Sequence, residues 1–259
     1  MHPADWRLIN GDTLEAIPAA LARARGNATA RLLAQSDWLL RRKSDGRFIA
    51  VRRGDLLREL NRGALTRRLA EDLPSLVEAD ANPDGLRPLS GLPERLHALG
   101  LDDDYGERTG LPLVAEPNVL SYAGRDRYAR PLWLTQTAAR AWNAMRSAAL
   151  HDAVALQAIS GYRSHAYQLG IFQRKIARGQ TVAEILQVNA APGYSEHHSG
   201  NAIDIGTPGE LPAEESFEQT SAFAWLQSRA DEFGFSMSYP RDNPHGIVYE
   251  PWHWRHTPF

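Results

Sequence analysis

Within its C-terminal half the chain reads Ser195-Glu196-His197-His198-Ser199-Gly200-Asn201-Ala202-Ile203-Asp204, and near its end it reads Glu250-Pro251-Trp252-His253. These segments offer two imidazoles and a carboxylate that could hold one metal ion. A second carboxylate stands three residues before one of the imidazoles. Two His and one Asp suit Zn²⁺ and leave a fourth position for water, as in catalytic rather than structural zinc sites. The two segments therefore predict a hydrolytic metal centre.

Asp204 is the carboxylate ligand of this predicted centre. It lies between Ile203 and Ile205 on a short strand expected at residues 202–205, so the isoleucines should face a core and Asp204 the opposite side. A buried carboxylate needs a partner, because an unpaired charge away from water is costly. A salt bridge is the ordinary partner for one such residue, but the nearby His197 favours a metal.

Glu250 and His253 are three residues apart, which places them on opposite faces of a flat strand. Both reach one site only if the backbone turns between them, and Pro251 fits such a break because it cannot donate a strand hydrogen bond. We assign His253 as the third ligand, beside His197 and Asp204, and Glu250 as the general base acting on water. The reverse assignment, with Glu250 bound and His253 catalytic, stays open at this point.

Arg163 belongs to the segment Ser160-Gly161-Tyr162-Arg163-Ser164, which follows a strand expected at residues 153–159. A guanidinium can donate hydrogen bonds to an oxyanion in a fixed geometry, as amide hydrolysis requires. Most arginines are surface residues, so the motif alone leaves that alternative open. Among the other histidines, we expect His198 to lie behind the site or on the surface. Further residues that could line the cleft are His165, His245 and His256.

The N-terminal part has a different pattern. Residues 12–34 have apolar positions at helical spacing, residues 38–51 predict a hairpin with Asp45-Gly46 at its turn, and residues 55–69 predict a second helix. We therefore expect a helix–hairpin–helix module at residues 1–84. Residues 85–117, rich in Pro and Gly, predict a linker or a wrapping segment with a short helix at 94–99.

Residues 118–259 predict one compact α+β unit that contains the metal centre. An amphipathic helix is expected at residues 135–150, and further helices are expected at 164–178 and 222–233. Short strands are expected at residues 153–159, 202–205 and 247–250. The two metal segments would then meet on a small sheet.

Composition limits the partners and the location. The 259 residues carry a net charge of −2, which predicts no strong attraction to nucleic acid, and contain no Cys, which excludes disulfides. Residues 23–68 hold 13 Lys or Arg against four acids, either a solvated basic face or a contact for an anionic polymer or partner. No transmembrane segment or signal peptide is visible, so we expect a cytoplasmic protein, or a periplasmic or extracellular one if a leader was removed. The oligomeric state is not predicted.

With these residues in view, the chain resembles the VanY-type D-alanyl-D-alanine carboxypeptidases. These belong to a zinc peptidase group with the VanX-type D,D-dipeptidases and the hedgehog N-terminal domain. The similar pieces appear in the family's order over residues 130–257. They are Ser160-Gly161-Tyr162-Arg163-Ser164 with Gln168, Gly193-Tyr194-Ser195-Glu196-His197 with Gly200, Ala202 and Asp204, and Tyr249-Glu250-Pro251-Trp252-His253-Trp254-Arg255.

The resemblance implies an α+β fold with a small, mainly antiparallel sheet packed with helices around one Zn²⁺. It implies His197, Asp204 and His253 as ligands, Glu250 as base and Arg163 as stabiliser of the transition state. Substrate would be positioned by Ser195 and Gln168, to which we add Trp252 and Tyr162.

The implied activity is removal of the C-terminal D-alanine from peptidoglycan stem peptides by attack of metal-bound water, as a D,D- or an L,D-carboxypeptidase. A cytoplasmic location would favour tetrapeptides and the L,D type. His165 and His198 depart from the family pattern, which bears on substrate preference. The alternatives are an endopeptidase or D,D-dipeptidase of the same group, or a non-catalytic murein-binding protein that docks through its basic N-terminal region.

Overall fold

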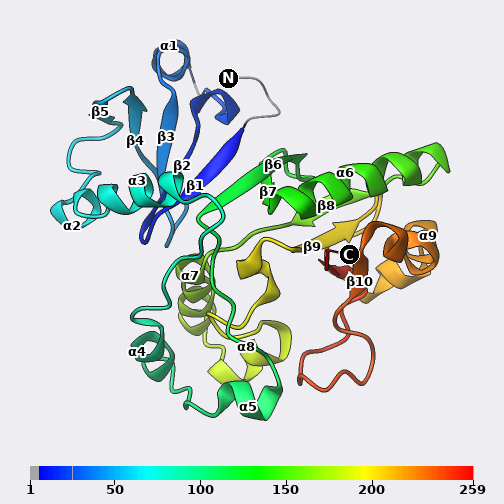
Figure 1. The fold of residues 1–259 in the computed structure, drawn as a ribbon. Coiled ribbons are helices and arrows are strands. Elements are labelled where there is room, and N and C mark those ends of the chain that lie inside the picture. Colours follow the sequence, from blue (N-terminus) through cyan, green and yellow to red (C-terminus); the bar gives the residue numbers. More distant parts are fainter. Residues whose placement is uncertain (1–5, 25, 259) are drawn as a thin grey trace. The chain divides into compact units, whose positions relative to one another are not determined.

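The computed structural model describes residues 6–24 and 26–258, and the chain divides into two compact units (Figure 1). Unit 1 comprises the described residues up to Arg87 together with Glu116–Tyr122. Unit 2 comprises Pro88–Ala115 and the chain from Ala123 onward. The chain therefore leaves unit 1, contributes a segment to unit 2, returns to complete unit 1 and leaves again.

Unit 1 is built on an antiparallel sheet. Its strands follow the order β5-β4-β3-β2-β1-β6, with bounds β1 Arg7–Asn10, β2 Leu14–Pro18, β3 Trp38–Arg42, β4 Phe48–Arg53, β5 Leu56–Glu59 and β6 Val119–Arg125. Strand β6 begins in unit 1, where Leu120 pairs with Leu8 of β1, and ends in unit 2. The short helices are α1 (Asn27–Ala34) and α2 (Arg67–Ala70), and helix α3 (Leu73–Ala81) packs on the sheet.

Two predicted helices of unit 1 are wrong. Residues 14–18 form strand β2, a short 3-10 helix follows at Ala19–Leu21, and α1 at Asn27–Ala34 is the only α-helix among the described residues of 12–34. All five residues of β2 are buried, and the strand lies between β1 and β3 in the sheet. A central strand needs apolar residues on both faces, and here their spacing resembled that of a helix. Residues 56–59 form edge strand β5, and only the end of the second predicted helix is helical, in α2, so the described residues do not form the expected helix–hairpin–helix module.

The hairpin is confirmed. Strands β3 and β4 pair antiparallel, and the turn between them places Gly46 at φ +68°, a backbone conformation that glycine adopts without strain. The basic residues around the hairpin are not all solvated. Lys43 is buried in an ion pair with Glu116, and Arg41 pairs with the buried Glu15.

Unit 2 confirms the α+β class. Its second sheet has the order β10-β11-β9-β8, with β8 at Gln157–Ser160, β9 at Ala202–Gly206, β10 at Phe235–Met237 and β11 at His253–His256. Helix α6 (Gln136–His151), capped by Thr135, buries Trp142 and Met145 in one apolar cluster with Ile203 and Ile205. Strand β7 (Pro131–Leu134) precedes α6 and is next to β6 in the strand order.

The remaining helices of unit 2 are α7 (His165–Ile176), α8 (Val182–Val188) and α9 (Ser221–Arg229), with short 3-10 helices between them. Helices α7 and α9 confirm two predicted helices to within a few residues. Strand β8 begins later than expected, at Gln157 instead of 153. The strand expected at 247–250 is wrong, because residues 247–250 have no regular structure and the strand is β11, at His253–His256.

Residues 88–115 pack with the rest of unit 2. They contribute helices α4 (Leu92–His97) and α5 (Tyr105–Thr109), whose buried side chains share an apolar cluster with Tyr194 and Tyr239. Gly193 has φ +91°, and a Cβ there would stand 2.4 Å from Leu92, so this close approach requires glycine. The segment is thus part of the core of unit 2. Across the described chain, no helix is both long and apolar enough to cross a membrane.

Candidate active site

The central strand pair of the second sheet places two of the predicted ligands. Strands β9 and β11 run antiparallel with Asp204 directly opposite His253. A register shift in β8 sets Ser160 opposite Asp204. Neighbouring side chains on the same face of a sheet lie within contact distance, so Asp204 and His253 meet without any further adjustment.

His197 reaches the same point from a short 3-10 helix, Glu196–Ser199. This helix ends at Gly200, whose φ of +70° turns the chain directly into β9. His197 Nε2 lies 3.3 Å from Asp204 Oδ2, and His253 Nδ1 lies 3.1 Å from Asp204 Oδ1. The three donor atoms lie within 4.8 Å of one another, and all three residues are buried.

The ring nitrogens that face away from this cluster are also held. His197 Nδ1 donates to the carbonyl oxygen of Gly161 at 2.7 Å, and His253 Nε2 donates to Glu196 Oε2 at 2.9 Å. Each acceptor is an oxygen without a proton to give, so a neutral ring would keep its proton on the outer nitrogen. Among the protein groups alone, burial lowers the pKa of His253, but its hydrogen bonds to Asp204 and Glu196 outweigh burial and raise that pKa to about 10. A metal would displace the inner proton, and the inner nitrogen of each ring would then offer its lone pair, as metal ligands require. The residues present therefore fit a zinc ion.

The carboxylates around the imidazoles are held in their charged form. Burial raises the pKa of Asp204, but His197 and His253 together outweigh it and leave that pKa well below its ordinary value. Burial likewise opposes ionisation of Glu196, yet the hydrogen bond from His253 and another from Ser238 lower the pKa of Glu196 to about 2. Both are anions at neutral pH.

Glu250 has a different environment. Burial, reinforced by the charge of Asp204, raises its pKa to about 7, although His253 and Arg163 act in the opposite direction. Its carboxylate lies 3.8 Å from His253 Nδ1 and accepts no hydrogen bond from the described residues. The predicted turn at Pro251 is confirmed, because residues 251 and 252 form a turn closed by the hydrogen bond from His253 N to Glu250 O.

Arg163 lies on the other side of the cluster. Its Nη2 lies 3.9 Å from Asp204 Oδ2, and its Nη1 donates to Gln168 Oε1 at 2.9 Å. Gln168 is fully buried on α7 and its amide nitrogen donates to the carbonyl of Ala190. The guanidinium is therefore fixed in position, with 15% of its side chain accessible.

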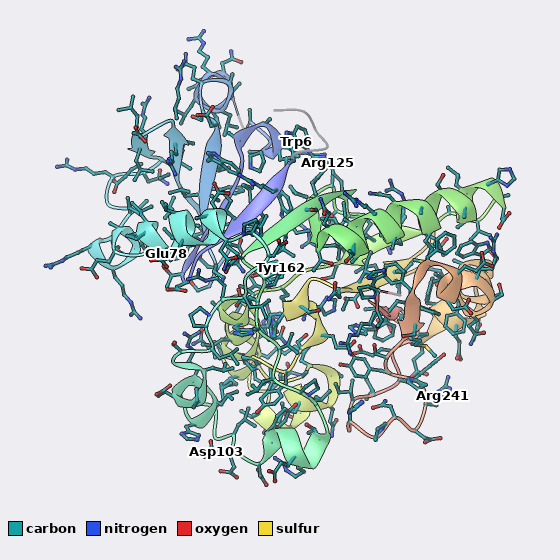
Figure 2. All side chains as sticks on the ribbon, in the orientation of Figure 1. Trp6, Glu78, Asp103, Arg125, Tyr162 and Arg241 are labelled. Carbon is teal, nitrogen blue, oxygen red and sulfur yellow. The ribbon has the colours of Figure 1, made fainter. Side chains whose placement is uncertain are left out.

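These groups open onto one cleft of about 290 Å³ in unit 2. The predicted residues that line it are Arg163, Gln168, Ser195, His197, Asp204, Glu250, Trp252 and His253. Tyr162, labelled in Figure 2, is not among the lining residues, although it immediately precedes Arg163 in the sequence. Its backbone N–H donates to Trp133 O, which ties this loop to β7.

The other histidines do not line the cleft. His198 is fully buried behind it, where its Nδ1 lies 2.5 Å from Arg163 O and its Nε2 accepts from Gly193 N. His165 bonds the carbonyl of Val114 and His245 that of Thr109. His256 is a buried residue beside Phe235. The expectation that three of them could line the cleft is wrong.

Four contributors to the site were not predicted from the sequence. Glu196 stands next to a predicted ligand, but only the 3-10 turn reveals that it reaches back to His253. Tyr239 lines the cleft with its ring 4.8 Å from that of His253. Lys175 and Asn189 line it from α7 and from the loop after α8. No local pattern identifies the last three residues, because their positions depend on tertiary packing.

An α+β fold that gathers two imidazoles, an aspartate, a further acid and an arginine in one cleft has the features of a metallopeptidase. Comparison with known proteins specifies the family. Residues 131–259 match the family described as "VanY: D-alanyl-D-alanine carboxypeptidase". The chain belongs to this family through that region.

Individual relatives agree with the assignment. The chain is 36% identical over 130 residues to YodJ of Bacillus subtilis (strain 168), covering 48% of this chain and 46% of the relative. It is 34% identical over 120 residues to a D-alanyl-D-alanine carboxypeptidase of Enterococcus faecalis (strain ATCC 700802 / V583), covering 42% and 43%. The chain thus spans less than half the length of these relatives. A solved structure of the LdcB LD-carboxypeptidase is 33% identical, with 48% of this chain and 59% of that chain covered and a TM-score of 0.45.

Proposed function

We propose that this protein is a zinc-dependent carboxypeptidase that removes a C-terminal D-alanine from peptidoglycan stem peptides. One observation carries the proposal: the donor atoms of His197, Asp204 and His253 converge within 4.8 Å, and Glu250 and Arg163 line the same cleft. The printed names of the family and of its relatives support D-alanine peptides as the substrate.

The metal ligands in this proposal are His197 Nε2, His253 Nδ1 and a carboxylate oxygen of Asp204. A single bound Zn²⁺ would supply Lewis-acid polarisation of the scissile carbonyl and a lowered pKa for water. The chain's own contribution is to hold the two rings in one tautomer through Gly161 and Glu196. Such outer hydrogen bonds orient ligands and strengthen metal binding.

Glu250 is the general base in this proposal. Its carboxylate lies next to the ligand cluster and is not engaged by another hydrogen bond among the described residues. It can therefore accept a proton from the attacking water and pass it to the leaving amine of D-alanine.

Arg163 is the group that stabilises the developing oxyanion. Its guanidinium is held by Gln168 on one side and faces Asp204 on the other, so its remaining N–H groups are pre-oriented toward the cleft. Fixed donors of this kind lower the barrier because they need no reorganisation during the reaction. Ser195 and Trp252 line the same cleft and would contact the peptide, whereas Tyr162 has no such support.

The first test is mass spectrometry of products from defined tetrapeptide and pentapeptide muropeptides. We expect loss of a single alanine, sensitive to a chelator and abolished in Glu250→Gln. The peptide consumed faster distinguishes the L,D type from the D,D type. Metal analysis of the purified protein should give one zinc per chain.

Other outcomes identify the alternatives. Cleavage elsewhere in the peptide would indicate an endopeptidase, and release of D-Ala-D-Ala would indicate a D,D-dipeptidase. If a folded, zinc-loaded sample cleaved nothing, the carboxypeptidase proposal would be overturned in favour of a binding role for the basic N-terminal region.

A further inference from the structure

The cleft contains a second cation that the proposed chemistry does not use. Lys175 lies on α7 seven residues after Gln168, and both line the cleft. Seven residues are close to two full turns of an α-helix, so the two side chains project from the same helix face about 10 Å apart along the axis. Long helical side chains lean toward the helix N-terminus, which brings the ammonium of Lys175 closer to Gln168.

The ammonium is anchored by a neutral group. Lys175 Nζ donates to Asn189 Oδ1 at 2.7 Å, and the next residue, Ala190, accepts from Gln168. The adjacent residues 189 and 190 thus hold two cleft-lining side chains of α7. An ammonium has three donors and Asn189 takes one, so others remain for a ligand. No ion pair within the described ranges involves Lys175, and its positive charge is not neutralised there.

Two cations line the cleft next to α7. Arg163 donates to Gln168 of α7 and also lies 3.9 Å from Asp204, whereas Lys175 lies on α7 itself. Burial lowers the pKa of Lys175, and the charge of Arg163 lowers it further. Like charges held close in a partly buried site are stabilised by an anion between or beside them.

We infer that Lys175, anchored by Asn189, binds a carboxylate of the peptide substrate and thereby selects peptides with a free C-terminus. The inference rests on the proposed peptidase function and specifies how the cleft recognises its substrate. The terminal carboxylate is the favoured source, because it lies within about one residue length, roughly 3.6 Å, of the scissile bond and the cleft is small. A side carboxylate further upstream is the other source of the same chemistry.

The test compares a peptide ending in a free D-alanine acid with the same peptide carrying a C-terminal amide. For the wild type we expect kcat/KM to favour the acid by about 10- to 100-fold, the range of a charge-assisted hydrogen bond. In Lys175→Met the ratio should fall close to one, mainly through KM for the acid. Lys175→Arg, which keeps the charge, should retain part of the preference.

The matched control is Arg174→Met, which removes the neighbouring cation of the same helix turn. Arg174 is exposed, stacks on Tyr167 and does not line the cleft. It should leave the acid-to-amide ratio unchanged. A ratio that stays high in Lys175→Met, in a variant with normal melting and zinc content, would overturn the inference. A third peptide has a free C-terminus but carries an amide in place of the upstream carboxylate. We expect the wild type to cleave it with a kcat/KM close to that of the unmodified acid. A fall in kcat/KM to the value of the C-terminal amide would contradict the assignment of Lys175 to the terminal carboxylate.

Binding separates this inference from the proposed function. In the Glu250→Gln background, calorimetry with the acid and amide peptides measures recognition without turnover. Acid-selective binding that disappears on adding Lys175→Met would support the subsite even if the wild type cleaved neither peptide. Equal binding of both peptides, with normal cleavage by the wild type, would overturn the subsite and leave the peptidase proposal standing.

Discussion

The two units use buried carboxylates in opposite ways. In unit 1, Glu116 is buried with Lys43 and also accepts from Asn10. Asp72 accepts from the backbone N–H groups of residues 12–14 and from Ser75. Each of these carboxylates is surrounded by donors of its own unit, so it stabilises a fold and has little capacity to bind anything else.

In unit 2 three carboxylates gather around the imidazoles of the site: Asp204 is buried, and Glu196 and Glu250 are half-buried. Asp204 and Glu196 interact with imidazoles, and Glu250 accepts no hydrogen bond from the described residues. Cavity size alone would have indicated a site in unit 1, which has a groove of about 800 Å³ beside α3. That groove is lined by apolar residues such as Trp38 and Leu57 together with several acids. The lesson is that convergence of incompletely satisfied polar groups, rather than volume, marks the site.

The largest effect on activity is expected when Glu250, whose carboxylate accepts no hydrogen bond from the described residues, is replaced. Glu250→Gln should lower kcat/KM by about 10³- to 10⁴-fold, because the amide cannot accept the proton of water. Zinc affinity and thermal melting should stay near those of the wild type. Steady-state kinetics with a zinc titration checks this, and a variant that unfolds instead would show that Glu250 is structural.

The corresponding change at a buried ion pair of unit 1 should lower stability without changing activity. Lys43→Met removes the buried cation that pairs with Glu116; the side chains of Lys43 and Glu116 are 2% and 5% exposed in the wild type. Removing one partner of such a pair costs about 3–5 kcal/mol. Native-state hydrogen exchange should report this loss in strands β1 to β4, while kcat/KM remains unchanged. An equal loss of kcat/KM would contradict the division of roles.

A third change tests whether residues 88–115 belong to the core of unit 2. Leu92 is 2% exposed in the cluster that contains Tyr194. Leu92→Ala should cost about 2–5 kcal/mol and reduce exchange protection around α4 and α8. Leu86→Ala is the control, since Leu86 is 65% exposed and its loss should change stability by less than about 0.5 kcal/mol. If Leu92→Ala destabilised the protein as little as Leu86→Ala, residues 88–115 would be a linker and not part of the core of unit 2.

The smallest of these effects concerns Glu196. Glu196→Gln removes the charged acceptor of His253 Nε2, and changes of this kind weaken metal binding about 10- to 100-fold. Competition with a chromophoric chelator measures the affinity directly. Glu232→Gln, a surface acid paired with Arg229, should leave it unchanged. If Glu196→Gln bound zinc as tightly as the wild type, its carboxylate would not be a support for the ligand.

Local patterns were sufficient for some elements and failed for others. Helix α6 and the β3–β4 hairpin were predicted because an apolar stripe and an Asp-Gly turn act within a few residues. Strand β2 was not, because its position is set by two flanking strands and by Asp72, about 58 residues away in sequence, which holds the preceding turn. Information of that range is absent from a window of 20 residues.

The residues of the site also differ in whether a local pattern could identify them. The candidates His197, Asp204 and His253 follow from residue chemistry and short spacings, and the structure brings them together. The positions of Glu196 and Lys175 could not be predicted. The first depends on the curvature of a 3-10 turn, and the second on how α7 packs against residues 189 and 190.

The interleaved path of the chain also orders its synthesis. Strand β6, which covers the outer edge of β1, is made only after residues 88–115, an interval of a few seconds at about 5–20 residues per second. During that interval the unpaired backbone groups of a nascent β1 can pair with other chains, which promotes aggregation. In the same interval Lys43 lacks the carboxylate of Glu116, with which it pairs in the folded protein. A fragment that stops at residue 87 would make both conditions permanent.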